Sequence, residues 1–509
     1  MTMSHAEFHS GPDLDDDAFL QGLGYKPQLS RKMSRFGNFA ISFSVISILS
    51  GCMTLYGFGM NTGGPSVMLW GWVAVGAMVM AVGAALAEVT SAYPTSGALF
   101  DMANRLGGPR WGYTTGWLNL LGLLGGIAGI DYGAAGFTSA FASLQWDYTP
   151  TPGKTMVIFA GILVLHAVLN LFGVRLVSVL NSISVWWHVL GVAVIAAALA
   201  MVPDQHQSTH FVFTTFVNNT GWGSHWYVAG IGLLLAQYTF CGYDASAHLS
   251  EETTQAQISA PRGIMHAIGW SWAAGFVLLA ALTYAIQDYS GTLGTATGVP
   301  PAQIFLDALG VTGAKILLLI VIAAQLFCGN AEVAACSRMV FAFSRNGALP
   351  GSRWWVRVSA RTGTPTAAVA LSVVVGGLLA LPALWSTVAY GAVTAINIIG
   401  ITPAYAVPIY LRLRAGDRFT PGPWNLGRFS KPIGWIAVVW VALVTVLFCL
   451  PQTKPASGLL SVQTFNYAPV ALAAALLLAM ICWYAFARRT FQTPVVAGDR
   501  SDTFADEVV

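Results

Sequence analysis

Residues 238–253 read Tyr-Thr-Phe-Cys-Gly-Tyr-Asp-Ala-Ser-Ala-His-Leu-Ser-Glu-Glu-Thr and place a glycine and a carboxylate in a segment otherwise apolar enough to cross a membrane. Gly242 weakens a helix by about 1 kcal/mol relative to alanine. Asp244 at membrane depth costs roughly 2.5 to 3.5 kcal/mol. We therefore expect a broken helix here. Irregular backbone at that depth survives only where it is buried in protein or lines an aqueous cavity.

The overall composition is that of a polytopic membrane protein. Hydrophobic residues make up 55% of the 509 positions and charged residues only 9%, whereas soluble domains contain about 25% charged residues. Charge-free runs such as 155–174 and 432–450 reach the roughly 18 residues that can cross the hydrocarbon core of a bilayer. These features exclude a soluble enzyme.

The apolar runs predict twelve membrane spans. Their approximate bounds are 36–60, 66–89, 111–142, 155–173, 177–202, 226–250, 264–287, 314–343, 364–382, 385–410, 432–451 and 465–487. If both termini are cytoplasmic, Lys154, Lys315 and Lys454 are the only outside members of the 24 Lys and Arg residues. This distribution satisfies the positive-inside rule and predicts a multi-pass protein of the cell (plasma) membrane with both termini cytoplasmic. The net charge of +3 then reflects topology and not nucleic-acid binding.

The chain divides into a cytoplasmic N-terminal tail (1–35), a transmembrane domain (36–490) and a cytoplasmic C-terminal tail (491–509). The N-terminal tail is acidic before the first apolar run, so it lacks the basic region of a cleaved signal peptide. All six cysteines fall inside spans without paired spacing, which argues against disulfides and metal sites. We expect no metal and no cofactor.

A second helix break is expected in the first span, where Ser50, Gly51 and Cys52 lie near the middle. The first and sixth spans would be equivalent if spans one to five and six to ten formed two inverted repeats. A pair of glycine-interrupted spans in matching positions points to a binding site. Close helix packing is the alternative for Gly51, and it is the expected role of the glycines at 122, 126, 129 and 133.

Several further motifs accompany these breaks. They include Asn-Thr-Gly-Gly-Pro at 61–65, Leu-Ala-Glu at 86–88, Gly-Trp-Leu-Asn at 116–119, the segment 242–253, and Ser-Arg-Met-Val-Phe-Ala-Phe-Ser-Arg at 337–345. Together they resemble the amino acid/choline transporter family of the amino acid-polyamine-organocation superfamily, which includes bacterial amino acid and 4-aminobutyrate (GABA) permeases.

The resemblance covers about residues 30 to 490. It implies an all-α fold of two inverted five-helix repeats (36–202 and 226–410), like the LeuT fold, with two extra C-terminal helices (432–487). It also implies secondary transport of amino acids, 4-aminobutyrate, polyamines or choline across the lipid bilayer. The small-molecule substrate and, where transport is coupled, H⁺ are then the expected partners.

Free backbone groups at the two breaks suit a zwitterion, because helix N-termini attract a carboxylate and helix C-termini attract an ammonium group. The resemblance implies that the unwound segments hold the substrate. The predicted substrate-binding residues are therefore Ser50, Gly51, Cys52, Phe240, Cys241, Gly242, Tyr243 and Asp244. Phe240 is expected to close over the substrate from outside. For Asp244 three roles are open: N-cap of the second half-helix, contact with the substrate amine, or proton carrier.

Five further residues are candidates for coupling or gating: His188, Glu332, Glu251, Glu252 and Asp131. His188 occupies the fifth span, where some superfamily members have a lysine, and a histidine can carry a proton near neutral pH. A hydrogen-bonded core histidine is the alternative. Glu251 and Glu252 are expected opposite Arg105, Arg110 or Arg262, either as an inner gate or as a solvated pair.

Glu332 departs from the small residue that the family pattern favours, and Asp131 raises the same question. Glu332 is compatible with a cationic ligand such as a polyamine or with an internal pair to Arg338. An aromatic cage for a quaternary ammonium group could draw on Phe137, Trp186, Trp187, Phe240 and Tyr243, although aromatic residues in spans more often serve the core or the interface.

Two other classes of function compete with transport. A membrane-embedded enzyme is disfavoured because the sequence contains no Walker motif and no His-Glu-x-x-His or Gly-x-Ser-x-Gly signature. A non-transporting amino acid sensor of the same fold would bind its ligand without flux. Proton coupling or exchange is favoured over sodium because no cluster of oxygen ligands is evident. The sequence leaves the oligomeric state open.

Overall fold

The computed structural model describes residues 16–146, 148–385, 389–455 and 465–491, and in these ranges its regular secondary structure is helical apart from two isolated β-bridges. Eleven helices there are long and apolar enough to cross a membrane. They are α2 (Arg35–Ile46) continued by α3 (Ile48–Thr54), α5 (Gly64–Ala92), α7 (Pro109–Trp146), α8 (Pro152–Leu171), α9 (Val174–Met201), α14 (Ala256–Tyr284), α16 (Pro300–Arg345), α18 (Thr366–Ala380), α19 (Ala389–Ala415), α20 (Ser430–Cys449) and α21 (Ala468–Cys482). The predicted all-α polytopic class is confirmed.

The sixth predicted span, 226–250, is not one of these long helices but a series of short segments. It consists of α11 (His225–Gly232), α12 (Leu234–Thr239), α13 (Ala245–His248) and the 3₁₀ turn η1 (Ser250–Glu252). Further along the chain, the predicted span 314–343 is part of the longer helix α16, which has a non-helical residue at Gly310.

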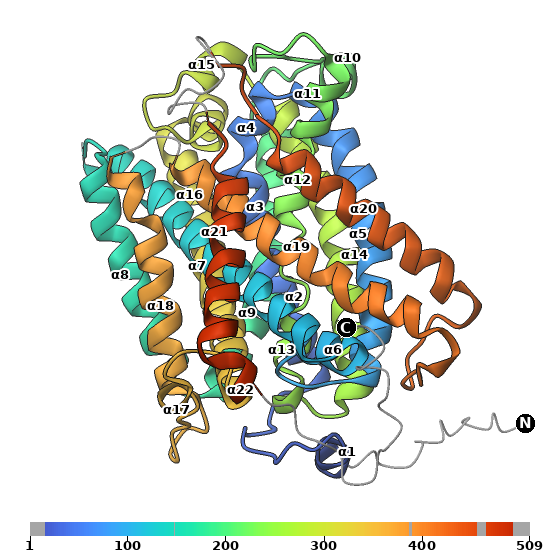
Figure 1. Ribbon diagram of the computed structural model, residues 1–509. Coiled ribbons are helices and arrows are strands. Elements are labelled where there is room, and N and C mark those ends of the chain that lie inside the picture. The colour runs from blue at the N-terminus through green and yellow to red at the C-terminus, as the bar shows by residue number, and fades with distance from the viewer. Residues whose placement is uncertain (1–15, 147, 386–388, 456–464, 492–509) are drawn as a thin grey trace, which may run out of the picture.

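Short helices mark the two ends of the molecule (Figure 1). The lower end in that view carries α1 (Asp16–Gly22), α6 (Leu99–Gly107), α17 (Ser352–Trp355) and α22 (Arg488–Thr490), and we call it the α1 side. The upper end carries α4 (Tyr56–Asn61), α10 (Thr209–Thr214), α11 and α15 (Tyr289–Leu293), and we call it the α10 side.

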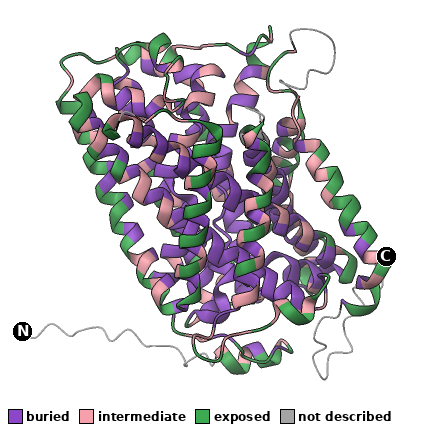
Figure 2. Cartoon of the chain, turned by 90° about the vertical axis from the view of Figure 1, so that its left-hand side faces the viewer, coloured by how far each residue is buried: buried purple, intermediate pink, exposed green. Residues whose placement is uncertain are grey.

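Helix α7 runs through the centre and packs against α16 and α19. Buried residues fill this centre, whereas the outer helices carry exposed faces (Figure 2). Gly122 of α7 allows the close approach to α19, because a Cβ atom there would lie 2.6 Å from the amide nitrogen of Ile401. Its predicted packing role is therefore supported. Large apolar side chains such as Val164, Leu190 and Val439 are exposed on the outer helices, as lipid contact requires.

The first helix break lies at Ser47 and not at Ser50–Cys52, so its predicted position was wrong by three residues. Ser47 has a left-handed conformation (φ 32°, ψ 83°) between α2 and α3. Its amide donates to the Phe43 carbonyl, and its own carbonyl accepts from the amides of Ser50 and Gly51. Gly51 is helical, which shows that the glycine serves close packing and not the change of backbone direction.

The second break lies where the sequence predicts it. Helix α12 ends at Thr239, Gly242 has a positive φ of 88°, and α13 begins at Ala245. The Gly242 amide donates to the Tyr405 hydroxyl of α19 at 3.0 Å and not to a helix carbonyl. A glycine is required here because L-residues with side chains rarely adopt this conformation.

Candidate functional site

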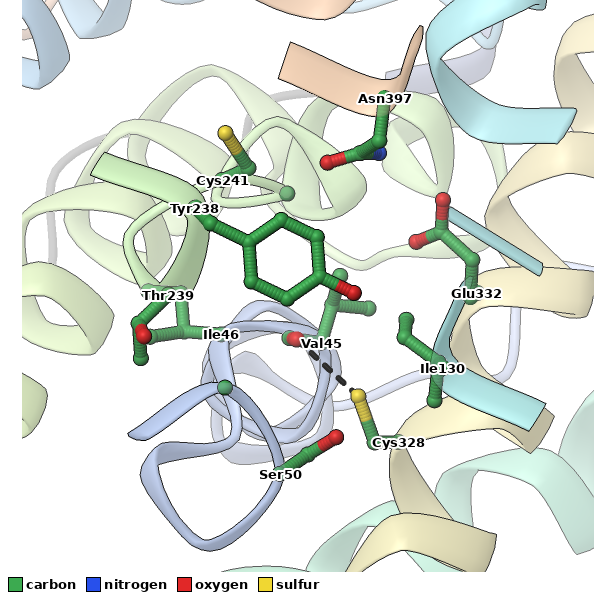
Figure 3. A pocket seen from close by; sticks show the side chains of 12 residues that line it. Val45, Ile46, Ser50, Ile130, Tyr238, Thr239, Cys241, Cys328, Glu332 and Asn397 are labelled. Atoms are coloured by element: carbon green, nitrogen blue, oxygen red, sulfur yellow. Dashed lines mark hydrogen bonds between the residues drawn. The ribbon is translucent and has the colours of Figure 1, made fainter. Parts of the chain in front are cut away.

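A small cavity lies between the two breaks at the centre of the helix bundle (Figure 3). Its lining comes from both breaks and from α7, α16 and α19, and comprises Val45, Ile46, Ser50, Gly51, Ile130, Tyr238, Thr239, Cys241, Gly242, Cys328, Glu332 and Asn397. The cavity volume is about 20 Å³, room for about one water molecule. Since ligand sites usually measure roughly 300 to 1,000 Å³, this conformation is closed around its centre.

The two breaks pack into each other on one side of this cavity. A Cβ atom on Gly51 would lie 2.8 Å from the Cα of Thr239, and one on Gly242 would collide with the Val45 side chain. Cys328 of α16 donates its thiol to the Val45 carbonyl at 3.2 Å (Figure 3). Each break thus presents a glycine to the other, and both contribute backbone to the cavity wall.

Four of the eight predicted substrate-binding residues line the cavity: Ser50, Gly51, Cys241 and Gly242. The other four, Cys52, Phe240, Tyr243 and Asp244, are buried around it but are not part of its lining. Phe240 stacks on Trp72 of α5 with ring centroids 4.4 Å apart. Tyr243 stacks on Tyr405 at 4.5 Å. In this conformation both aromatic rings pack against neighbouring helices outside the cavity.

Asp244 is not the side-chain cap of α13, so that alternative was wrong. Its Oδ1 atom accepts from the Tyr405 hydroxyl at 2.7 Å, and its Oδ2 atom lies 3.3 Å from Asn119 Nδ2 and 3.2 Å from His248 Nε2. These partners belong to α19, α7 and α13. The carboxylate that follows the turn at Gly242 thus points toward neighbouring helices. Asp244 therefore ties the second break to the surrounding helices.

Glu332 borders the cavity from α16 and is 1% exposed. Neither of its carboxylate oxygens has a hydrogen-bond partner among the residues that the structure describes. Gly126 of α7 gives it room, because a Cβ atom there would collide with Oε1. The alternative of an internal pair with Arg338 is wrong, because that guanidinium binds Glu252 at 2.7 Å.

Asp131 pairs with His166 of α8 through Oδ2 and Nδ1, 3.0 Å apart, and both side chains are fully buried. The opposite atoms, Asp131 Oδ1 and His166 Nε2, have no hydrogen-bond partner in the described part of the chain. Gly329 makes room for this pair, since a Cβ atom there would overlap Asp131 Oδ1. Asp131 does not line the cavity.

His188 contacts the first break directly. Its Nε2 atom lies 2.7 Å from the hydroxyl of Ser47, and its Nδ1 atom lies 2.8 Å from the Ser184 carbonyl. Because a carbonyl only accepts hydrogen bonds, Nδ1 carries a proton, and Nε2 of a neutral imidazole then accepts from Ser47. The predicted coupling residue is thus in contact with the residue at which the helix changes direction.

Glu251 and Glu252 close the α1 side through buried ion pairs, but the predicted arginine partners were wrong. Glu251 binds Arg345 at 2.8 and 2.9 Å, and Glu252 binds Arg338. Both glutamates are at most 3% exposed, so they are not a solvated pair. Arg105 instead binds Asp101.

The N-terminal segment covers these ion pairs on the α1 side. The Tyr25 hydroxyl donates to Asp101 Oδ1 at 2.6 Å, and the Arg345 guanidinium lies over the Tyr25 ring. Arg31 donates to the carbonyls of Ser250 and Thr253.

A larger pocket of about 490 Å³ lies on the α10 side. Its lining includes Met53 and Thr54 of α3 and Tyr132 and Gly133 of α7. These residues lie about one helical turn along the same helices from Ser50 and Ile130, which line the central cavity. The two sides of the molecule thus differ, with ion pairs on the α1 side and a pocket on the α10 side.

Sequence reasoning missed several lining residues, notably Tyr238, Cys328 and Asn397. Asn397 is a polar residue in a long charge-free run, a signal that could have been used. Its Nδ2 atom donates to the Gly122 carbonyl at 2.8 Å. Cys328 and Tyr238 carry no such signal, because nothing in the sequence around them distinguishes them from other residues of their apolar spans.

Residues 33–477 match a family model described as amino acid permease. Amino-acid permease BAT1 of Arabidopsis thaliana is 38% identical over 497 residues, 94% of this chain and 95% of that protein. A homolog of it from Oryza sativa subsp. japonica is 39% identical over 500 residues, with the same coverage. A GABA-specific permease of Saccharomyces cerevisiae is 28% identical over 495 residues, 94% of this chain and 86% of that protein. The chain therefore belongs to the amino acid permease family, and it is a multi-pass membrane transporter of amino acids.

Proposed function

We propose that this permease is a secondary active transporter that moves amino acids or related amines such as 4-aminobutyrate by alternating access. The observation that carries the proposal is the meeting of two broken helices at a closed central cavity. Backbone polar groups left without helical partners at such breaks suit both charged ends of a zwitterion. The yeast relative named as GABA-specific supports testing 4-aminobutyrate first.

Alternating access would move one set of helices relative to another around these breaks. The ion pairs of Glu251 and Glu252 would form the gate on the α1 side, and the pocket beside Thr54 would be the entrance on the α10 side. The reciprocal packing of the breaks supports two inverted repeats, 36–202 and 226–410, with 432–487 as additional helices.

Orientation follows from the basic residues. Arg105, Arg345 and Arg488 lie in or beside elements of the α1 side, and by the positive-inside rule that side would be cytoplasmic. Both termini would then be cytoplasmic in a plasma membrane protein.

For coupling we propose protons or exchange, with His188 as the proton-binding residue. The imidazole reaches Ser47 at the break, so a change in its protonation would change the hydrogen bond that holds this residue. A choline transporter is the weaker candidate, because Trp186 and Trp187 are 62% and 38% exposed on the outer surface of α9 and Phe240 packs on Trp72. An aromatic cage would need these rings to face one cavity.

Uptake into proteoliposomes by the purified full chain tests this proposal. Labelled 4-aminobutyrate, alanine, lysine, putrescine and choline would be offered with internal ligand, pH gradient and sodium gradient varied separately. Concentrative uptake driven by the pH gradient, or exchange dependent on internal ligand, is expected for an amino acid or amine. Binding without flux of any compound would indicate a sensor and contradict the proposal.

A further inference from the structure

The carboxylate of Glu332 is the feature of the cavity that no internal partner explains. It is the only lining residue with an ionisable acid or base side chain other than cysteine and tyrosine, and both of its oxygens are unpartnered within the described residues. Figure 3 shows Glu332, Asn397 and Tyr238 pointing toward one another across the cavity. A buried carboxylate without a partner is costly, so a ligand or a proton must satisfy it for part of the transport cycle.

The charged groups around Glu332 favour a cation over an anion. Its electrostatic neighbours are the carboxylates of Asp244 and Asp131. The nearby bases face other carboxylates, since His166 pairs through Nδ1 with Asp131 and Arg338 binds Glu252. A substrate carboxylate would be repelled at this end of the cavity. It would therefore bind at the other wall, which is lined by residues of the two breaks.

Asn397 adds a second polar side chain to the cavity wall near Glu332. Asn397 donates from its Nδ2 atom to the Gly122 carbonyl, and Figure 3 shows its oxygen on the Cys241 side of the cavity wall, away from Glu332. Gly126 keeps α7 clear of Glu332 Oε1. A carboxylate acceptor with a small neighbour beside it suits an ammonium group, which offers hydrogen-bond donors and no acceptor.

We propose that Glu332 binds a cationic nitrogen that lies several methylene groups from the substrate carboxylate. The preferred substrates would be ω-amino acids such as 4-aminobutyrate and basic amino acids such as lysine. A neutral α-amino acid carries its only ammonium group next to the carboxylate and would leave Glu332 unpaired. This assignment rests on the proposed function, because it takes the central cavity to be the substrate site.

Calorimetric titration of the purified full chain in detergent tests the assignment without requiring transport. The ligands are 4-aminobutyrate, lysine, alanine and 4-hydroxybutyrate, which has the length of 4-aminobutyrate without its charge. The wild type is expected to bind 4-aminobutyrate and lysine at least tenfold more tightly than alanine and 4-hydroxybutyrate. Equal affinity for 4-aminobutyrate and 4-hydroxybutyrate would overturn the assignment, and this comparison depends on no variant.

Glu332→Gln keeps the shape of the side chain and removes its charge. We expect it to weaken binding of 4-aminobutyrate and lysine at least tenfold and to leave alanine binding unchanged. The matched control is Asp307→Asn, an exposed carboxylate on the same helix, which should change neither. Equal weakening for every ligand, or normal binding with loss of pH-driven uptake only, would overturn the assignment, the latter by making Glu332 a proton site.

Failure of the inference and failure of the proposed function give different results. A protein that binds 4-aminobutyrate through Glu332 but does not move it in proteoliposomes would contradict transport and leave the assignment intact. A protein that transports alanine and lysine equally well in both the wild type and Glu332→Gln would retain the proposed function and lose the assignment.

Discussion

Gly51 of α3 lies against the backbone of Thr239 in α12, so closely that a Cβ atom on the glycine would stand 2.8 Å from the Thr239 Cα. The contact has a counterpart at the other break, where Gly242 lies against Val45. Only Gly242 has a positive φ. The two glycines thus serve different needs, since one permits a close approach and the other permits both that approach and a left-handed backbone.

Gly51→Ala should therefore reduce uptake strongly, because the added methyl group forces α3 away from α12. Overpacking of this kind costs about 1 to 3 kcal/mol, and Gly51→Leu should abolish uptake. The measurement is uptake per folded protein, with folding checked by size-exclusion chromatography. Gly161→Ala on α8 is the control, since nothing lies within 4 Å of its added Cβ atom. Wild-type uptake by folded Gly51→Leu protein would contradict the site.

The second break was predictable from the sequence, because Gly242 and Asp244 interrupt an apolar run. The first break was misplaced for a physical reason. Ser47 is an ordinary residue in a membrane helix, and its left-handed conformation accompanies a tertiary contact with His188, 141 positions away. Sequence patterns reveal residues that break a helix by themselves, but not residues that the surrounding fold holds in an unusual conformation.

The residues of the proposed gate illustrate the same distinction. Two adjacent glutamates at the end of a span are visible in the sequence, yet their partners Arg345 and Arg338 are 94 and 86 positions away. Those pairs depend on how α16 packs against η1. Likewise, the sequence singles out Glu332 as unusual, but the absence of a partner and the room made by Gly126 are properties of the packed helices.

His188 provides a test of coupling. A protonated imidazole would donate from Nε2 to Ser47, whereas a neutral one accepts from it, so proton uptake reverses the hydrogen bond at the break. If this reversal couples protons to transport, His188→Ala should reduce pH-driven accumulation more than exchange. Ser47→Ala, which keeps the histidine, should alter the pH dependence of uptake. Equal loss of accumulation and exchange in His188→Ala would instead indicate a structural role.

Glu251→Gln should loosen the α1-side gate. The change removes one charge of a pair whose side chains are 1% and 13% exposed, and breaking a buried pair costs roughly 3 to 5 kcal/mol. Cys241 and Cys328 line the cavity and report its accessibility. We expect a polar thiol reagent to modify them at least tenfold faster in the variant, as measured by peptide mass spectrometry.

The control for this gate is Lys431→Gln, which removes a charge from an exposed pair with Asp417 at 3.9 Å. Exposed pairs contribute only about 0 to 1 kcal/mol, so cysteine modification should stay at the wild-type rate. An unchanged rate in Glu251→Gln as well would show that this ion pair does not limit access from the α1 side.

Tyr25→Phe should release the N-terminal segment from the gate. The hydroxyl that donates to Asp101 also accepts from Asn346, and leaving buried partners unsatisfied costs about 1 to 3 kcal/mol. Burial raises the pKa of Tyr25 above its ordinary value of 10.0, and the Asp101 carboxylate raises it further. Because the folded pKa exceeds the unfolded one, the contribution is complete below pH 10.0 and is lost only at higher pH.

The destabilisation by Tyr25→Phe should accordingly be the same from about pH 5 to pH 8, a range in which histidines titrate but this phenol does not. Thermal unfolding of wild type and variant at several pH values measures it, and limited proteolysis locates the released segment. Lys26→Gln, a change at the neighbouring exposed position, controls for a general effect on the tail. A destabilisation that appears only at one end of this pH range would mean that the segment is held through a titrating group and not through the Tyr25 hydroxyl.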